Sequence, residues 1–409
     1  MSPVNFFNQP IQIGDLVVKN RVFLAPLAGV SDIPFRRICQ EMGAGLTYVE
    51  MLSATAIAYQ NKRTFEMMAR HAQESVLGVQ VTGPCSEQVA SAIRYLDKQG
   101  FDTIDINMGC PVKKVVNAGC GSGFLKDPQR ITETIKQSRA ATNRPLSVKY
   151  RIGYTRDAIS VTDTTERALL ENVDMFTVHG RTRSEGYETP CDHKNIAKAI
   201  EVSKRFSSKV VKVGNGDLFS YSSAYLMQHN TQCDAVMVSR GALGNPWIFQ
   251  EILNNKPVAP SFAEWLDLVM RHISYQQEHY GNNKLAAILA RKHLLWYTKG
   301  FPASKAVRET LNRVESLDAA REILKNYAAN IANSALRSFS NGSEAVQSSY
   351  DPKYEMDRVL DRGVGAEDLI VTRNERKAPT LEVGDISGAP SMGALFRVQV
   401  PNNEDRSSC

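Results

Sequence analysis

Short apolar runs rich in β-branched residues recur eight times in the first 240 residues of the chain. Most are separated by segments with helical periodicity, as at 87–98 and 128–140. Strands that alternate with helices pair in parallel through βαβ crossovers, and eight such units fit this length, so the pattern predicts a closed (β/α)8 TIM barrel. The predicted strands are Val22–Ala25, Leu46–Glu50, Val76–Val81, Thr103–Ile106, Leu146–Tyr150, Met175–Val178, Val210–Val213 and Ala235–Val238.

An open, doubly wound sheet is the alternative, because periodicity alone does not distinguish it from a closed barrel. That fold carries a glycine fingerprint after its first strand, whereas the first predicted strand here continues into PLAGV at 26–30. The glycine-rich run GCGSG at 119–123 comes much later and matches a loop better than a strand–helix turn. The closed barrel is therefore favoured.

The strand pattern ends after Trp247, and the chain then reads as a small helical domain. Ser261 and Ser304 are the predicted N-caps of two helices, and Gly281 and Gly300 are predicted helix stops. The predicted helices are Phe262–Glu278, Asn283–Thr298, Ser304–Val314 and Leu317–Ala328.

A change of composition near residue 338 marks the end of these helices, because the chain becomes rich in Ser, Asn, Gly, Asp, Glu and Arg. We therefore expect a barrel domain at 1–250, a helical domain at 251–335 and a flexible tail at 336–409.

Composition narrows the class of protein. A hydrophobic content of 43% and a charged content of 22% are ordinary for a globular chain. The segment 1–20 does not resemble a signal peptide and no run reaches the length of a membrane span, so we expect a cytoplasmic protein without a membrane partner. The net charge of +6 permits a polyanionic partner without requiring one.

Seven cysteines are scattered along the chain without a Cys-x-x-Cys pair. This spacing argues against a disulfide framework, a zinc site and an iron–sulfur cluster. We therefore expect no metal, and any functional cysteine should act as a lone thiol.

Polar or special residues lie at, or just beyond, the C-terminal end of nearly every predicted strand. In a (β/α)8 barrel this end carries the active site, because the eight βα loops converge there. Any one of these residues can be a helix cap or a satisfied core group, but so many on one rim favour a site. They are Pro26, Glu50, Gln80, Asn107, Lys149, Arg151, His179, Asn215, Ser239 and Arg240.

The loop after the fourth predicted strand places Cys110 between Gly109 and Pro111. A cysteine in such a loop is less often a buried small hydrophobe than one in a helix or strand. Because no second Cys or His lies at metal-ligand spacing, the thiol is expected to be a nucleophile or a general acid.

Lys149 and Arg151 alternate on the fifth strand and therefore point to one face. Two cations directed into a barrel need an anionic or electron-rich partner, which a reduced flavin, a phosphate or a uracil carbonyl would supply. The alternative is that a carboxylate such as Glu50 or Asp105 neutralises them.

The last two βα loops contain GNGD at 214–217 and SRG at 239–241, and both combine glycine with polar donors. Loops after strands seven and eight often bind phosphate in these barrels. Asn245-Pro246 is predicted to open a short helix, with Asn as the N-cap and Pro at the first position. A cofactor phosphate is the expected ligand.

Several segments together resemble one family. They are LAPLAGVSD at 24–32, DINMGCPVKK at 105–114, KYR at 149–151, VHGRT at 178–182 and SRG at 239–241. The chain resembles the tRNA-dihydrouridine synthases over residues 11–328, and ARKH at 290–293 with WYTKG at 296–300 is most similar to the bacterial B-type branch. It departs from the usual pattern at Leu27, where Met is usual, and at Ser239, where Gly is common.

The resemblance implies a flavoenzyme barrel whose C-terminal helical domain helps to hold tRNA. By resemblance, NADPH or NADH reduces FMN, hydride passes from FMN N5 to uracil C6, and Cys110 donates the proton to C5. Residues implied to contact FMN are Pro26, Leu27, Ala28, Gln80, Lys149, His179, Asn215, Gly216, Asp217, Ser239 and Arg240. Asn107 and Arg151 are implied to lie near the uracil.

Basic residues near the predicted mouth and on the predicted helices are candidates for phosphate contacts with tRNA, and solvated basic surface is the alternative. They are Lys113, Lys114, Arg181 and Arg183 at the mouth, and Lys284, Arg291, Lys292, His293, Lys299, Lys305, Arg308 and Arg313 on the helices. The B-type resemblance implies position 17 of the D-loop, and we expect a monomer.

Two other functions stay open from the sequence. An FMN barrel could act on free pyrimidines, as dihydroorotate dehydrogenases do, but a basic helical domain is superfluous for a small substrate. A tRNA-binding protein could keep the barrel and lack the chemistry, but Cys110, Lys149 and His179 are all present.

Overall fold

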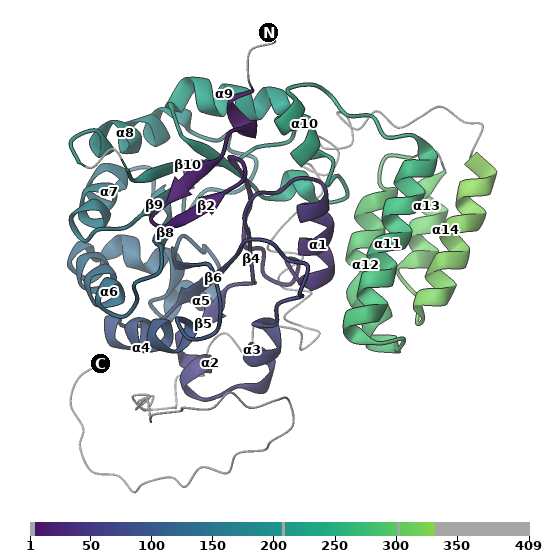
Figure 1. The fold of residues 1–409 in the computed structure, drawn as a ribbon, viewed down its shortest axis with the longest axis horizontal. Coiled ribbons are helices and arrows are strands. Elements are labelled where there is room, and N and C mark those ends of the chain that lie inside the picture. The colour runs from purple at the N-terminus through teal and green to yellow at the C-terminus, as the bar shows by residue number, and fades with distance from the viewer. Residues whose placement is uncertain (1–4, 207–208, 302, 332–409) are drawn as a thin grey trace, which may run out of the picture.

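Eight parallel strands form a nearly closed barrel in the computed structural model, which describes residues 5–206, 209–301 and 303–331 (Figure 1). The hydrogen-bonded order is β3-β11-β10-β9-β8-β7-β6-β4, and an isolated parallel bridge between Phe23 and Leu46 joins its two ends. The predicted barrel is confirmed, and the open sheet is not formed. The strands are β3 (Val22–Leu24), β4 (Thr47–Tyr48), β6 (Leu77–Thr82), β7 (Thr103–Met108), β8 (Leu146–Gly153), β9 (Met175–Thr182), β10 (Val211–Asn215) and β11 (Ala235–Val238).

The second predicted strand is shorter than expected. Val49 and Glu50 lie beyond β4, and the short β5 (Leu52–Ser53) then pairs with β6. Glu50 lies outside the ladder, and its carboxylate accepts the backbone N–H of Gly29 at 2.5 Å.

Helices cover the outside of the barrel in the expected alternation (Figure 1). In α6, Asp127 accepts the N–H of Arg130 at 3.1 Å and Pro128 occupies the first turn, while Ile131 and Ile135 are buried. The outer helices are α1 (Ile33–Glu41), α2 (Ala54–Ala58), α3 (Lys62–Met67), α4 (Ser86–Leu96), α5 (Lys113–Asn117), α6 (Pro128–Ala140), α7 (Val161–Leu170), α8 (His193–Ser203), α9 (Tyr221–Thr231) and α10 (Ile248–Asn254).

A short antiparallel hairpin of β1 (Ile11–Ile13) and β2 (Leu16–Val18) closes the N-terminal end of the barrel. Ile13 and Val18 are fully buried and pack with the apolar residues that fill the barrel interior. The hairpin turns at Gly14, whose φ of +55° suits glycine and where a Cβ would lie 3.0 Å from Asp174 and 3.3 Å from Pro145. Sequence patterns did not predict this hairpin.

Four helices form a separate bundle beside α1: α11 (Phe262–Tyr280), α12 (Lys284–Thr298), α13 (Ser304–Leu311) and α14 (Leu317–Ile331) (Figure 1). Ser261 caps α11 in a capping box with Glu264, as predicted for Ser261. Gly281 and Gly300 follow α11 and α12 with positive φ angles, which confirms both predicted stops.

Two predicted helix starts are wrong by one or two residues. The residue before α13 is Ala303, in the left-handed region with φ of +50°, and Ser304 is already helical. α10 starts at Ile248 because the backbone first makes tight i→i+3 turns, in which the N–H of Ile248 donates to the Asn245 carbonyl at 3.2 Å. Both errors arise because a cap is set by backbone dihedrals as well as by residue type.

Polar contacts attach the bundle to the barrel through α1. Arg37 pairs with Glu278 at 2.7 Å, and its guanidinium lies 3.6 Å from the centre of the Tyr275 ring. The Tyr275 hydroxyl donates to Glu41 at 2.5 Å. The boundary at residue 250 stays a prediction, and the predicted tail at 336–409 lies outside the described residues. Among the helices of the described part, none is long and apolar enough to cross a membrane.

Candidate active site at the barrel mouth

The loop after β3 lies at the mouth with Pro26, Leu27 and Ala28 half-buried. The Ser31 hydroxyl holds its shape, because the Leu27 N–H donates to Ser31 Oγ at 3.0 Å and that hydroxyl donates back to the Leu27 carbonyl at 3.2 Å. These contacts leave the predicted flavin-lining residues on the rim.

A hydrogen-bonded network of polar side chains crosses β6, β7 and β8 inside the barrel. The side-chain amide of Gln80 donates to Asp105 at 2.7 Å. The side-chain amide of Asn107 in turn donates to the side-chain oxygen of Gln80 at 2.8 Å. Ser147 donates to the other Asp105 oxygen at 2.6 Å. Burial raises the pKa of Asp105 to about 6, and the hydrogen bonds from Ser147 and Gln80 oppose that rise. The network therefore orients the Asn107 amide towards the next loop.

Asn107 also shapes the loop that carries Cys110. Its side-chain oxygen accepts the N–H groups of Gly109 at 3.0 Å and Cys110 at 2.9 Å, and Ser122 donates to the Cys110 carbonyl at 2.9 Å. The thiol keeps some solvent exposure at the mouth, yet the surrounding protein desolvates its anion. Burial therefore raises the pKa of Cys110, with partial opposition from the charges of Arg151 and Lys149. Cys110 is thus a protonated thiol on a fixed loop.

Lys149 and Arg151 both point into the mouth, as their alternation predicts. Lys149 Nζ donates to Asn215 Oδ1 at 2.9 Å. Desolvation and the neighbouring Arg151 lower the pKa of Lys149 to about 8, and Asp105 opposes this shift. Arg151 donates to the Gly109 carbonyl at 2.9 Å and to the Thr182 carbonyl at 2.7 Å. Of the two carboxylates considered for neutralising this pair, Asp105 acts on Lys149, whereas Glu50 faces Gly29 and Lys292.

The loops after β10 and β11 form the second part of the mouth. Asn215 donates to the Met237 carbonyl at 2.7 Å and to Ser239 Oγ at 3.0 Å, so the hydroxyl of Ser239 has a defined partner. Asp217 lies between two guanidinium groups, with Arg181 at 2.7 Å and Arg240 at 2.9 Å.

Gly216 gives the first of these loops its close approach to β9. Its φ is +126°, and a Cβ there would lie 3.0 Å from the His179 ring and 2.6 Å from the Cys191 sulfur. Desolvation and the charges of Arg151 and Lys149 hold the pKa of His179 well below its usual range, so the imidazole is neutral.

Two predicted tRNA contacts at the mouth have different surroundings. Lys113 begins the short α5 and is exposed. Arg181 is only 1% exposed and donates to the carbonyls of Thr189 at 2.6 Å and Tyr187 at 3.1 Å as well as to Asp217. This placement gives Arg181 an internal role in holding the Asp217 loop rather than a surface for RNA.

Several basic residues of the bundle also face inward rather than outward. Arg291 donates to the Val314 carbonyl at 2.9 Å, Lys292 donates to the Gly29 carbonyl at the mouth, and His293 is 2% exposed. Sequence reasoning missed the contact between Lys292 and Gly29 because 263 residues separate the two.

Comparison with known proteins identifies the family. The family model described as dihydrouridine synthase (Dus) matches residues 23–335. The chain belongs to the dihydrouridine synthase family. It is 34% identical to tRNA-dihydrouridine synthase B of Pasteurella multocida over 309 residues, which cover 74% of this chain and 91% of that protein. It is also 34% identical to the probable tRNA-dihydrouridine synthase 1 of Synechocystis over 323 residues, 77% of this chain and 88% of that one.

Among solved structures, this dihydrouridine synthase resembles histamine dehydrogenase from Rhizobium sp. 4-9 with a TM-score of 0.50 and 10% identity. The match covers 81% of this chain and 65% of that one. At this identity the likeness supports the barrel fold alone. The family model and the relatives establish the chain as an oxidoreductase of the dihydrouridine synthase type.

Proposed function

We propose that this dihydrouridine synthase binds FMN at the barrel mouth and reduces one uridine of tRNA to 5,6-dihydrouridine, with NADPH or NADH as reductant. The observation that carries the proposal is the protonated Cys110 thiol, held on a loop by Asn107, beside the cationic side chains of Lys149 and Arg151. A mouth of this kind joins a proton donor to an environment that stabilises anions.

The residues present fit a flavin mononucleotide. Lys149 and Gln80 offer donors to a planar, electron-accepting ring, and Pro26, Leu27 and Ala28 line the rim beside them. The absence of a Cβ at Gly216 lets this loop pack directly against His179 and Cys191 at the mouth. We assign the phosphate to the loops of Asn215–Asp217 and Ser239–Arg240, where Arg181 and Arg240 together give one more positive charge than Asp217 balances.

When bound, the flavin supplies the hydride that is added to C6 of the uracil. The chain itself must then deliver a proton to C5, and the Cys110 Sγ–H is the proposed source. Burial favours the neutral thiol, so the proton is present at neutral pH and becomes available as negative charge develops on the uracil. Arg151, which also donates to the Gly109 carbonyl, is positioned to stabilise that charge.

A tRNA substrate is supported by the named relatives and by exposed cations. Lys113 and Lys114 lie on the exposed side of α5, one loop away from Cys110. A base must leave its stack to enter a barrel mouth, and phosphate contacts can hold the flanking backbone while it does so. We propose residues 1–250 as the catalytic barrel and 251–335 as the tRNA-holding domain, acting as a monomer on position 17 of the D-loop.

The deciding experiment measures dihydrouridine in unmodified tRNA after incubation with purified protein, FMN and NADPH. We expect product above a no-enzyme control, and mapping its position tests the assignment to position 17. Free uracil and orotate are the matched controls. Consumption of either, without dihydrouridine in tRNA, would replace the proposal with a free-pyrimidine reductase, and a colourless protein that binds tRNA without turnover would replace it with a binding protein.

A further inference from the structure

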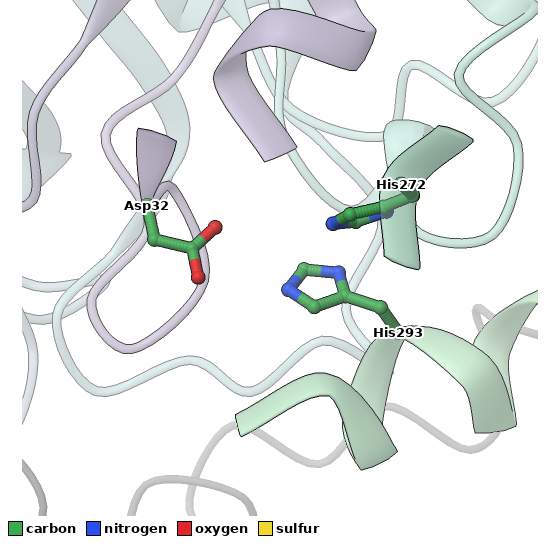
Figure 2. A group of neighbouring side chains, drawn as sticks. All are labelled: Asp32, His272 and His293. Carbon is green, nitrogen blue, oxygen red and sulfur yellow. The ribbon is translucent and has the colours of Figure 1, made fainter. Parts of the chain in front are cut away.

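Three buried side chains meet where the helical bundle joins the barrel, away from the proposed chemistry. Asp32 precedes α1, His272 comes from α11 and His293 from α12, and Figure 2 shows the carboxylate and the two imidazoles turned toward one another. One ligand atom of each lies within 4.8 Å of the others. All three residues are buried, with exposures of 8%, 3% and 2%.

The two histidines each offer a nitrogen that the protein leaves unused. Within the described residues, Nε2 of His272 and Nε2 of His293 are buried and have no hydrogen-bond partner. A buried polar atom without a partner costs free energy, so two of them directed at one carboxylate require an explanation. A bound ion that accepts both lone pairs supplies one.

The other side of the His272 ring is already arranged as a metal ligand requires. Its Nδ1 lies 2.9 Å from the Tyr297 hydroxyl. Metal-binding histidines commonly use their second nitrogen in this way, because the outer contact fixes the tautomer and the ring orientation. Phe35 packs against both imidazoles, with ring centroids 6.2 Å from His272 and 5.0 Å from His293, and limits their rotation.

One cation lies beside the group. Lys292 directly precedes His293 on α12, and its ammonium donates to the Gly29 carbonyl. Its charge disfavours a cation, but the carboxylate of Glu50 acts on Lys292 and offsets part of that effect.

We propose that Asp32, His272 and His293 bind one divalent transition-metal ion, with Zn²⁺ the preferred occupant, and that this ion joins the helical bundle to the barrel. Two imidazoles and one carboxylate form a ligand set typical of Zn²⁺, with a fourth position left for water. Metal–ligand bonds are about 2.0–2.1 Å long, so the three groups must move together slightly when the ion binds.

A cleft lies next to the site. Asp32 lines a cleft of about 550 Å³ between the barrel and the bundle, and Tyr280, which shares that wall, donates to Asp32 Oδ2 at 3.3 Å. The other oxygen, Oδ1, accepts the N–H of Phe35 at 3.2 Å, and Figure 2 shows the carboxylate turned toward the two imidazoles. The spacing of cysteines does not predict such a site, because its ligands are an aspartate and two histidines on three separate elements.

The test uses the full chain, stripped with a chelator and dialysed against Zn²⁺ or Co²⁺, with metal content measured by mass spectrometry. We expect about one equivalent in the wild type and, with Co²⁺, visible absorption bands of a nitrogen- and oxygen-ligated ion. His272→Asn and His293→Gln should each lose the stoichiometric metal while keeping the wild-type circular dichroism. His279→Gln, also on α11 but outside the three-residue group, is the matched control and should keep it.

Two further measurements keep the proposal open to refutation if a histidine variant folds poorly. Tyr297→Phe should weaken Zn²⁺ binding roughly 10–100-fold, because it removes only the outer contact. Added Zn²⁺ should raise the thermal midpoint of the wild type and not that of His293→Gln. Absence of stoichiometric metal in the wild type, or its full retention in both histidine variants, would overturn the site. None of these readouts depends on tRNA reduction.

Discussion

The two ends of the barrel consist of the same eight strands but contain opposite kinds of side chain. At the N-terminal end, Ile13 and Val18 of the hairpin are fully buried against apolar strand residues. At the C-terminal end, the strands carry charged and amide groups such as Asp105, Lys149 and Asn215, whose contacts are hydrogen bonds. The N-terminal end therefore stabilises the fold, whereas the C-terminal end carries polar groups whose burial lowers stability and which form the candidate site.

The cost at the C-terminal end is visible in its titrating groups. Burial raises the pKa of Asp105 and lowers that of Lys149, so both charged forms are disfavoured by their surroundings. Buried titratable groups with shifted pKa values are typical of functional sites, where they contact a ligand. The comparison predicts that changes at the mouth alter chemistry more than stability, and that changes at the hairpin do the reverse.

The largest effect is expected from Cys110→Ser at the mouth. Replacing the proposed proton donor should reduce dihydrouridine formation in tRNA by about 10²–10⁴-fold, the range of general acid catalysis. Bound flavin and NADPH oxidation should stay near wild type, because the loop keeps its bonds to Asn107 and Ser122. Product quantification with parallel flavin absorbance measures both. Cys85→Ser is the matched control, and loss of flavin in Cys110→Ser would make this cysteine structural.

Ile13→Ala at the opposite end is expected to cost a comparable free energy, but the loss should appear in the stability of the fold and not in the rate of the reaction. Removing this fully buried side chain should lower the free energy of unfolding by about 2–5 kcal/mol, since a cavity remains in the apolar cluster under the hairpin. Turnover per folded molecule should not change. Urea unfolding measures the first quantity. Val17→Ala, at a residue 63% exposed on the same hairpin, should change stability by less than about 0.5 kcal/mol. A large loss of turnover in folded Ile13→Ala would break the contrast between the ends.

An intermediate effect is expected from Asn107→Ala, which removes the acceptor for the N–H groups of Gly109 and Cys110. Each net hydrogen bond contributes about 1 kcal/mol, so the loop should lose its fixed position and tRNA reduction should fall about 10–100-fold. NADPH oxidation should change less, since Lys149 and Asn215 are untouched and Gln80 loses one hydrogen bond but keeps its bond to Asp105. Steady-state rates of both half-reactions check this. Equal losses in both would place Asn107 at the flavin rather than in the Cys110 loop.

The last prediction concerns pH and the flavin-free protein. The folded-state pKa of Lys149, about 8, lies below its ordinary value of 10.5. Between these two values the unfolded chain keeps the Lys149 proton and the folded protein does not, so raising the pH stabilises the folded state. Relative to Lys149→Met, the wild type should therefore gain stability from pH 8 to 10.5. Urea midpoints of both proteins across this range measure the difference, and parallel curves would contradict the shift.

The sequence by itself determined the barrel, the helical bundle and the residues of the rim. Strand–helix alternation depends on local periodicity, and a polar residue at the end of an apolar strand is placed on the rim by any parallel barrel. The alternation of Lys149 and Arg151 likewise predicted a shared face, which the structure confirms.

Only the tertiary structure decided which groups meet. Asp217 lies between Arg181 and Arg240, and Lys292 contacts Gly29, which is 263 residues away in the sequence. The hairpin of β1 and β2 closes the N-terminal end of the barrel. The group of Asp32, His272 and His293 likewise forms only when the bundle docks against α1. Local patterns act over a few residues along the chain, whereas these partners are set by barrel closure and helix docking, so no short motif encodes them.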